Sequence, residues 1–236
     1  MKLFLDSGDR VEINQKWKGV FAGVTCNPTI LKKDGITDPI AYAHQVAQDI
    51  YPLPLSVECP KLRLEDCKRF IDAVLAVYEN DCIQHTNVVI KIPILDHNGR
   101  CLIELMQLLL NHYNGSLSEG SSPILKLNVT CLMSAQQAFL VSQLGNAIQY
   151  VSLFAGRIDD MNGGAVHEIK RTAELLKATE SSTKIIACSV RQVSNILQWL
   201  EAGADIVTVP PSYLEKMAFH PRTRETVEQF TRDAEV

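Results

Sequence analysis

The chain has 236 residues, of which 46% are apolar, so it can bury a substantial core and is long enough for one barrel-sized domain but short for two full ones. Its 23 Lys and Arg residues against 27 Asp and Glu give a net charge of −4, which argues against nucleic acid or an anionic membrane surface as the main partner. Asp6 interrupts the opening apolar stretch too early for a secretory signal, and no apolar run is long enough to span a bilayer. We therefore expect a single cytoplasmic domain over residues 1–236 that acts on a small molecule.

Short apolar runs alternate along the chain with longer segments of helical periodicity. The apolar runs predict eight strands near Leu3–Asp6, Gly23–Thr25, Leu55–Glu58, Val88–Ile92, Ile124–Val129, Tyr150–Phe154, Lys184–Ala187 and Ile206–Val209. The amphipathic segments between them predict helices at Asp38–Ile50, Leu64–Glu79, Arg100–Tyr113, Ala165–Ala178 and Val190–Glu201. Eight such units in alternation indicate an α/β fold, the (β/α)8 TIM barrel.

Two further helices are indicated by their first residues. Ser134 with Gln137 three residues later has the spacing of a capping box at a helix start. A helix over about 221–233 follows the eighth unit and begins at Pro221, a residue suited to the first helical turn. Val227 and Phe230 fall on one side of this additional C-terminal helix, so we expect it to pack across the barrel rim or onto a neighbouring subunit.

The fourth predicted strand, Asn87–Pro93, carries a single lysine, Lys91, among β-branched residues. Burying an ammonium group is costly, so such a lysine is either ion-paired or used as a neutral amine. Desolvation favours the uncharged amine, which is the form that attacks a carbonyl carbon to make a Schiff base. The strand by itself leaves a structural ion pair with a nearby carboxylate open.

Polar residues gather at the predicted strand ends, where a barrel of this kind places its catalytic groups. Singly, each of them could be a helix cap, a turn residue or a satisfied core group. Seven units that deliver polar groups to one face of a barrel favour a functional site instead. In chain order these residues are Asp6, Thr25, Asn27, Glu58, Lys91, Asn128, Thr130, Ser152, Arg157, Ser189 and Arg191.

Several segments together resemble the transaldolases, and more narrowly the short-chain transaldolase and fructose-6-phosphate aldolase group. The similarity runs in order and at similar spacing from Met1 to the terminal helix. It is carried by Phe4-Leu5-Asp6-Ser7, Gly23-Val24-Thr25-Cys26-Asn27-Pro28-Thr29, Val89-Ile90-Lys91-Ile92-Pro93, Asn128-Val129-Thr130, Ser152-Leu153-Phe154-Ala155-Gly156-Arg157-Ile158-Asp159-Asp160, Ala187-Cys188-Ser189-Val190-Arg191 and Ala204-Asp205-Ile206-Val207-Thr208-Val209-Pro210.

The resemblance implies roles for four catalytic residues. Lys91 matches the lysine that forms an imine with the ketose, and Asp6 matches the base that takes the proton of the C4 hydroxyl as the C3–C4 bond breaks. Glu58 and Thr130 match the pair that holds a water molecule for proton relay. A carboxylate accepts protons and a hydroxyl orients a water molecule, so the chemistry of these residues suits the roles.

The resemblance also implies how the substrate is held. Asn27 and Asn128 match groups that bind the dihydroxyacetone portion, while Arg157, Ser189 and Arg191 match phosphate-binding positions, for which the planar fork of arginine is suited. Without the resemblance, a solvated salt-bridging loop over 157–160 is an equal alternative. The full predicted substrate-binding set is Asn27, Thr25, Asn128, Ser152, Phe154, Arg157, Ser189 and Arg191.

Two residues bear on the reaction within this group. At the positions of Glu58 and Phe154, the chain resembles the transaldolases, which have glutamate and phenylalanine there. The fructose-6-phosphate aldolases tend to have glutamine and tyrosine at these positions. The sequence therefore favours transfer of a dihydroxyacetone unit from fructose 6-phosphate or sedoheptulose 7-phosphate to an aldose phosphate. Three alternatives remain: aldol cleavage that releases free dihydroxyacetone, a non-catalytic sugar-phosphate-binding barrel with Lys91 ion-paired to Glu58 or Asp6, and catalysis by Cys188 or Cys59 with a histidine base.

The remaining expectations concern metals, thiols and assembly. The histidines are dispersed and the seven cysteines lack a C-x-x-C pair, so we predict no metal site, no cofactor and reduced thiols. The resemblance implies the non-oxidative pentose phosphate pathway and a homo-oligomer, with the decamer common in the group. Departures from the group are Cys26 in place of a threonine, the 96–99 segment, and a long loop over 114–122, which we expect at the bottom of the barrel with effects on assembly.

Overall fold

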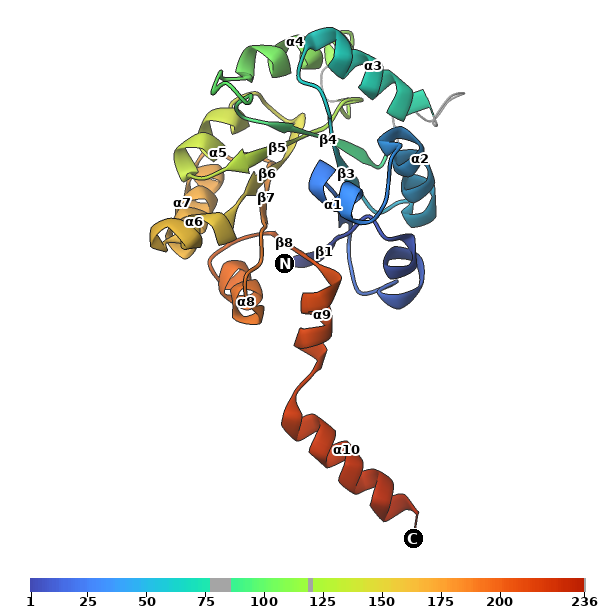
Figure 1. Ribbon diagram of the computed structural model, residues 1–236. Helices are drawn as coiled ribbons and strands as arrows, with labels where there is room; N and C mark the ends of the chain where they lie inside the picture. Colours follow the sequence, from blue (N-terminus) through green and yellow to red (C-terminus); the bar gives the residue numbers. More distant parts are fainter. Residues whose placement is uncertain (77–85, 119–120, 236) are drawn as a thin grey trace.

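The computed structural model describes residues 1–76, 86–118 and 121–235 (Figure 1). Eight parallel strands form a closed barrel in which each strand pairs with the next and β8 pairs with β1. This architecture confirms the predicted (β/α)8 barrel. The strands are β1 (Lys2–Asp6), β2 (Val24–Thr25), β3 (Leu55–Glu58), β4 (Val88–Pro93), β5 (Leu127–Leu132), β6 (Ile148–Leu153), β7 (Lys184–Ala187) and β8 (Ile206–Val209).

Helices surround the barrel and cover the outer faces of its strands (Figure 1). Their apolar stripes and the outward-facing strand residues form one continuous core between the two layers. The helical elements are the π-helix η1 (Glu12–Lys16) and the α-helices α1 (Pro28–Lys33), α2 (Pro39–Ile50), α3 (Leu64–Leu75), α4 (Ile103–Asn114), α5 (Ala135–Ser142), α6 (Ala155–Asn162), α7 (Ala165–Ala178), α8 (Val193–Glu201), α9 (Pro211–Ala218) and α10 (Pro221–Ala234).

Side chains at the ends of the helices account for several of the observed boundaries. Asp38 accepts hydrogen bonds from the first backbone amides of α2, so this helix begins one residue later than predicted. Ser134 accepts from Gln137 N as predicted, but the Gln137 side chain accepts from Met133 N, so the reciprocal half of the predicted capping box is absent from this turn. The helix predicted over Val190–Glu201 begins only at Val193 of α8, after Gln192 caps it.

Three other boundaries differ from the sequence prediction. The helix predicted from Arg100 begins three residues later because Leu95 and Cys101 pair as a short antiparallel bridge. The fifth strand begins three residues later than predicted because the backbone of Leu125 bonds to the side chain of Asn114 at 2.9 and 3.0 Å instead of to a neighbouring strand. Helix α3 ends at Leu75, and the rest of its predicted length, from 77 to 79, lies outside the described residues.

The barrel interior has a layer of apolar side chains near the amino-terminal ends of the strands. Its members are Phe4, Val89, Tyr150, Ile186 and Ile206, and they form a cluster separate from the core outside the barrel. The Phe4 and Tyr150 rings meet edge to face with centroids 5.8 Å apart. A Cβ on Gly23 would lie 2.6 Å from the Phe4 ring, so the glycine makes room for this ring inside the barrel.

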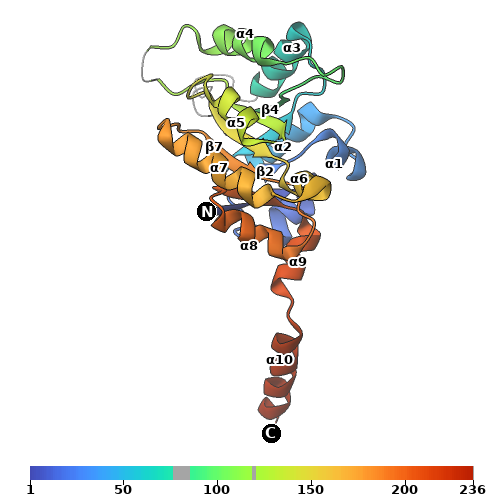
Figure 2. The ribbon, with the colours of Figure 1, turned by 90° about the vertical axis from the view of Figure 1, so that its left-hand side faces the viewer.

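The C-terminal helix α10 extends away from the barrel (Figure 1, Figure 2). None of its residues is buried, and Val227 and Phe230 are 55% and 66% exposed. The expectation that this helix packs across the barrel rim is therefore wrong for this chain, because a short connection after α9 directs it outward. Its packing onto a neighbouring subunit stays a prediction.

The loop after α4 joins that helix to the start of β5, so its described residues, 115–118 and 121–123, lie at the amino-terminal end of the barrel. Residues 119–120 of the predicted insertion lie outside the described residues. In the part of the chain that the structure describes, no helix is both long and apolar enough to cross a membrane.

Candidate active site

Lys91 lies inside the barrel near the carboxyl-terminal end of β4. Alternation along the strand turns Ile90 and Ile92 toward the surrounding helices and Lys91 inward, where it is 5% exposed. Its Nζ atom donates a hydrogen bond of 3.0 Å to the backbone carbonyl of Cys26 and lies 3.8 Å from Oε2 of Glu58. The lysine is thus held by two neighbours inside a closed ring of strands.

The register of the strands places two polar residues beside Lys91, and others lie on the same inner face of the barrel. Glu58 on β3 and Asn128 on β5 are the backbone partners of Lys91 on its two sides. On β1, Asp6 is the partner of Thr25 on β2. Since neighbouring parallel strands place paired residues side by side, these side chains converge on the barrel interior above the Phe4 layer.

Asp6 ends β1 and accepts a hydrogen bond of 2.6 Å from Oγ1 of Thr25. Thr25 in turn bonds to the hydroxyl of Thr208 on β8. Burial raises the pKa of Asp6 above its ordinary value, although the charge of Lys91 and the bond from Thr25 act in the opposite direction. A carboxyl group with a raised pKa binds a proton more readily than one in water, which suits a group that takes a proton and later returns it.

Glu58 and Thr130 flank Lys91 near the mouth of the barrel. Burial raises the pKa of Glu58, and the nearby charge and hydrogen bonding of Lys91 lower it in part. Oγ1 of Thr130 is buried and has no hydrogen-bond partner among the described residues. A buried hydroxyl without a partner is a position that a water molecule or a substrate group can satisfy.

Asn128 and Ser152 form the inner side of this polar layer. The Asn128 amide donates to Oγ of Ser56 at 2.9 Å and accepts from Oγ of Ser152 at 2.7 Å. Ser56 and Thr208 also belong to this polar layer and were not predicted from the sequence. The signal for Ser56 was strand alternation, because Ser56 is two residues before Glu58 and so faces the same side of β3.

Asn27 has a structural role in addition to its predicted one. It is the N-cap of α1, and its Oδ1 accepts a hydrogen bond of 3.0 Å from Ile30 N. The side chain is partly exposed at the end of β2, beside the Cys26 carbonyl that holds Lys91. Its amide NH2 group remains the part that could serve a ligand.

The rim of the barrel at β6 and β7 is closely packed. A Cβ on Gly156 would lie 1.7 Å from the backbone oxygen of Ser189, so only glycine allows this approach. Ser189 itself has a positive φ of 67°. Helix α6 therefore begins directly against the loop after β7, and both of these elements carry predicted phosphate-binding residues.

The two predicted phosphate-binding arginines have different surroundings. Arg157 is exposed, and its guanidinium lies over the Phe154 ring at 5.0 Å. Arg191 forms an ion pair with Asp160, with Nη2 at 2.7 Å from Oδ2, and this pair lowers the pKa of Asp160. Residues 155–162 form α6 rather than a loop, so the alternative of a salt-bridging loop is wrong in its structure, although one of its acidic residues does pair with an arginine.

The cysteines named as alternative nucleophiles are engaged elsewhere. Sγ of Cys188 donates to the Leu153 carbonyl at 3.1 Å, and burial raises the pKa of this thiol. Sγ of Cys59 lies 3.6 Å from Sγ of Cys67. In the described residues neither thiol bonds to a histidine, and no group of three or more potential metal ligands comes together there.

Comparison with known proteins gives a family match across almost the whole chain: residues 3–235 match the family described as Transaldolase/Fructose-6-phosphate aldolase. The chain belongs to this family of aldolase and transaldolase enzymes. The resemblance noted in the sequence is thereby confirmed.

Similar proteins within the transaldolase/fructose-6-phosphate aldolase family are full-length matches. A probable transaldolase of Thermodesulfovibrio yellowstonii is 31% identical, with 100% of this chain and 98% of the relative covered. A probable transaldolase of Caldicellulosiruptor saccharolyticus is 32% identical, with 100% and 97% covered. The chain thus spans nearly the whole length of these relatives.

More distant solved structures share the barrel alone. A putative dihydrodipicolinate synthase family protein from Coccidioides immitis has a TM-score of 0.53 at 10% identity, with 80% of this chain and 54% of that chain covered. Thiamine phosphate pyrophosphorylase from Pyrococcus furiosus has a TM-score of 0.50 at 11% identity, with 89% and 85% covered. At such identities the likeness concerns the fold and carries no information on the reaction.

Proposed function

We propose that the protein is a transaldolase that moves a dihydroxyacetone unit from fructose 6-phosphate or sedoheptulose 7-phosphate to an aldose phosphate through a Schiff base on Lys91. The observation that carries this proposal is the position of the Lys91 nitrogen, which is buried inside the barrel with a carboxylate oxygen of Glu58 at 3.8 Å. Asp6 is close enough for the charge of Lys91 to act on its pKa, and the unpartnered Thr130 hydroxyl lies two residues beyond Asn128 on β5.

In the first step the neutral Lys91 amine attacks the C2 carbonyl carbon of the ketose, and the carbonyl oxygen becomes the hydroxyl of a carbinolamine. Loss of that hydroxyl as water, with one proton added to it, leaves the iminium ion. Glu58 and Thr130 hold the water molecule that relays these protons. The raised pKa of Glu58 suits a group that must both give and take a proton in this step.

In the second step Asp6 takes the proton of the C4 hydroxyl. The C3–C4 bond then breaks, its electron pair moves into the iminium ion to give an enamine on Lys91, and C4 becomes the aldehyde of the departing sugar phosphate. The acceptor aldehyde reverses these events: the enamine carbon attacks it, and Asp6 returns the proton to the new hydroxyl. The bond from Thr25 holds the Asp6 carboxyl in one orientation during both transfers.

The remaining predicted residues would hold the two ends of the sugar phosphate. Asn128, Ser152, Thr25 and the amide group of Asn27 border the position of the dihydroxyacetone portion. The phosphate would lie at the rim, where α6 begins and where Arg157, Ser189 and Arg191 come from neighbouring loops. Arg191 would divide its donors between Asp160 and the phosphate, because a guanidinium carries five N–H groups.

The choice of transfer over release rests on Glu58 and Phe154. Phe154 offers no hydroxyl beside the enamine, so water has no oriented proton donor there and the enamine waits for an aldehyde. The alternative within the same family is cleavage that releases free dihydroxyacetone.

A coupled assay with fructose 6-phosphate separates these two reactions. With erythrose 4-phosphate present, a transaldolase forms sedoheptulose 7-phosphate and glyceraldehyde 3-phosphate at a steady rate. Without an acceptor it releases little dihydroxyacetone. Equal rates of dihydroxyacetone release with and without the acceptor would assign the cleavage reaction instead, and no turnover in either case would favour a sugar-phosphate-binding barrel.

We further propose a cytoplasmic homo-oligomer in which α10 packs on a neighbouring subunit. The support is the exposure of Val227 and Phe230 on a helix that makes no buried contact with its own barrel. Light scattering of the chain should give a mass several times 26.3 kDa, and removal of residues after Phe219 should reduce it. A monomeric full-length chain would contradict this assignment.

A further inference from the structure

A chain of three hydrogen-bonded side chains joins β2, β1 and β8 inside the barrel. Thr25 on β2 and Thr208 on β8 lie on the two strands that flank β1, which carries Asp6. Oγ1 of Thr25 lies 2.6 Å from Oδ1 of Asp6, and it also bonds to Oγ1 of Thr208. The proposed reaction gives roles to Asp6 and Thr25, but none to Thr208.

Thr208 points into the barrel because of strand alternation. Its neighbours Val207 and Val209 are fully buried in the core outside the barrel, whereas Thr208 shares the inner face with Ile206 of the lower apolar layer. Thr208 is 3% exposed, and a hydroxyl at such a position is costly unless it is hydrogen-bonded. Its one hydrogen-bond partner among the described residues is Thr25. The bond between the two threonines is therefore what the hydroxyl of Thr208 adds to the structure.

The direction of these hydrogen bonds follows from counting hydrogens. A threonine hydroxyl has one hydrogen to donate, and an ionised carboxylate has none. When Asp6 is ionised, Thr25 donates its hydrogen to Asp6, so the hydrogen between the two threonines has to come from Thr208. Donation to the Thr25 oxygen polarises the O–H bond of Thr25 and strengthens its bond to the carboxylate. Thr208 thus acts on Asp6 through Thr25.

This chain gives the two oxygens of Asp6 different roles. Oδ1 accepts the hydrogen bond from Thr25, whereas Oδ2 accepts none from the described residues and can take the proton of a substrate hydroxyl. Oδ1 can still accept from Thr25 after that transfer, so neither threonine has to turn during the step. The bond from Thr25 lowers the pKa of Asp6 against the effect of burial, because it favours the charged form.

We propose that Thr208 is a positioning residue for the general base. Its hydroxyl donates to Thr25, so that Thr25 directs its own hydrogen at Oδ1 of Asp6 and leaves Oδ2 to act as the base. This inference rests on the proposed function of Asp6 in the transaldolase reaction. The hydrogen-bond chain itself is a property of the folded protein, so it can also be tested without turnover.

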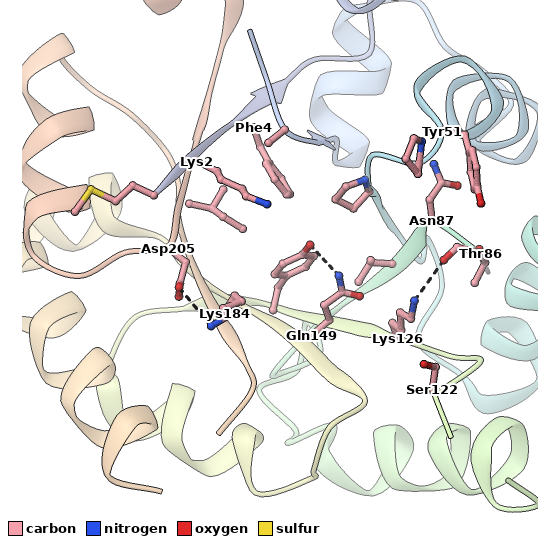
Figure 3. Close-up of a pocket in the computed structure, with 17 residues that line it drawn as sticks. Lys2, Phe4, Tyr51, Thr86, Asn87, Ser122, Lys126, Gln149, Lys184 and Asp205 are labelled. Atoms are coloured by element: carbon pink, nitrogen blue, oxygen red, sulfur yellow. Dashed lines mark hydrogen bonds and ion pairs between the residues drawn. The ribbon is translucent and has the colours of Figure 1, made fainter. Parts of the chain in front are cut away.

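Two substitutions of Thr208 and one control separate this role from a contribution to the core. Thr208→Val removes the hydroxyl and keeps the shape of the side chain, whereas Thr208→Ser keeps the hydroxyl. Thr86→Val is the matched control, because Thr86 is also 3% exposed and its hydroxyl accepts from Val88 N at 3.1 Å. Thr86 lies at the opposite, amino-terminal end of the barrel, where it lines a cavity of about 500 Å³ that three lysines also line (Figure 3).

The first test is the pH profile of kcat/KM for fructose 6-phosphate with erythrose 4-phosphate as acceptor. Thr208→Val should move the acid limb of this profile to higher pH, because Asp6 then holds its proton more tightly. On the acid side of the limb, kcat/KM should fall about two- to fivefold. Thr208→Ser and Thr86→Val should keep the original limb. The inference is overturned if Thr208→Val keeps it too, or if either of the other variants moves it as far.

The second test is urea unfolding, which needs no turnover. The loss of stability in Thr208→Val should grow as the pH rises through the pKa of Asp6, because the weakened bond stabilises the ionised carboxylate. In an Asp6→Asn background the same substitution should cost the same at every pH. If the original protein lacks turnover, the proposed function fails, and this comparison still decides the inference. A loss that does not depend on pH, or a dependence that persists without the Asp6 carboxyl, overturns it.

Discussion

The two layers of the barrel interior differ sharply although the same strands build both. On β1 the inward residue changes from Phe4 to Asp6, and on β4 it changes from Val89 to Lys91, in each case within two residues. The lower layer is apolar and packs edge to face, whereas the upper layer is a set of hydrogen-bonded polar groups. A barrel can thus separate stability from chemistry by one step of strand alternation.

The buried carboxyl groups of the upper layer show that this layer has an energetic cost for the fold. Burial raises the pKa of both Asp6 and Glu58, which means that their charged forms are less favourable here than in water. The lower layer carries no such penalty. We therefore expect changes in the upper layer to affect mainly the reaction, and changes in the lower layer to affect mainly the stability of the fold.

The largest effect should come from Lys91→Met. This change keeps an apolar side chain of similar length and removes the proposed nucleophile, so transaldolase turnover should fall by about four orders of magnitude or more. Lys126→Met is the matched control, because it removes a half-buried lysine at the other end of the barrel. If a steady-state assay finds comparable losses of turnover in the two variants, the proposed difference in function between the two layers is wrong.

Asp6→Asn should lower turnover by about 10²- to 10⁴-fold, the usual contribution of a general base. The asparagine oxygen can still accept the hydrogen bond from Thr25, so the fold should be retained. The assay is fructose 6-phosphate turnover with erythrose 4-phosphate as acceptor. Turnover within a factor of ten of the original protein would exclude Asp6 as the base.

The same variant tests the cost of burying the carboxylate. Because the pKa of Asp6 is raised in the native state, the native state binds its proton more tightly than the unfolded chain does. The protonated carboxyl therefore stabilises the fold at low pH, and this contribution is lost as the pH rises through the raised pKa. The stability of Asp6→Asn relative to the original protein should increase from pH 4 to pH 8 in urea unfolding.

Asp160→Asn provides a control of opposite sign for this pH dependence. The pair with Arg191 lowers the pKa of Asp160, so its contribution to stability is present above the ordinary value of the carboxyl and is lost as the pH falls. Relative to the original protein, Asp160→Asn should therefore become less stable as the pH rises. Identical pH trends in the two variants would contradict the assignment of buried and exposed carboxyl groups.

In the lower layer, Phe4→Ala should destabilise the fold by about 3–5 kcal/mol, as for other buried aromatic residues truncated to alanine. Turnover per folded molecule should change far less than in Asp6→Asn, although the two residues are neighbours on the same face of β1. Urea unfolding and an active-site titration measure the two quantities separately. A large loss of turnover with little loss of stability would reverse the proposed division.

The smallest effect concerns Phe154, at the rim of the upper layer. Phe154→Tyr places a hydroxyl near the enamine, so the ratio of free dihydroxyacetone to transfer product should rise several-fold. The ring that supports the Arg157 guanidinium is retained, so binding of the sugar phosphate should change little. An unchanged ratio of the two products would refute the role given to this position.

The sequence predicted the parts of this fold and site that depend on alternation and on strand order. The eight strands and the inward direction of Lys91 follow from runs of apolar residues, and the convergence of Glu58 and Asn128 on it follows from parallel register. The resemblance supplied the roles proposed for these residues, which the pattern by itself could not separate from caps and ion pairs. Asn27 illustrates this difficulty, because its side chain does cap a helix in addition to its predicted role in substrate binding.

Other features depended on contacts between distant residues, and the sequence pattern could not predict them. The hydrogen bond from Lys91 to the Cys26 carbonyl joins residues 65 positions apart. The later start of β5 depends on the side chain of Asn114, the last residue of α4. The cavity at the amino-terminal end of the barrel was not predicted, because the lysines that line it are, one by one, ordinary surface residues.

Borohydride reduction in the presence of fructose 6-phosphate, followed by mass spectrometry of peptides, tests whether Lys91 forms the iminium ion. Reduction of an iminium ion fixes a dihydroxyacetone unit on the reacting amine, so we expect this mass on the peptide containing Lys91 and not in Lys91→Met. A chain that turns over fructose 6-phosphate without this adduct, or that carries the adduct on another lysine, would contradict this expectation.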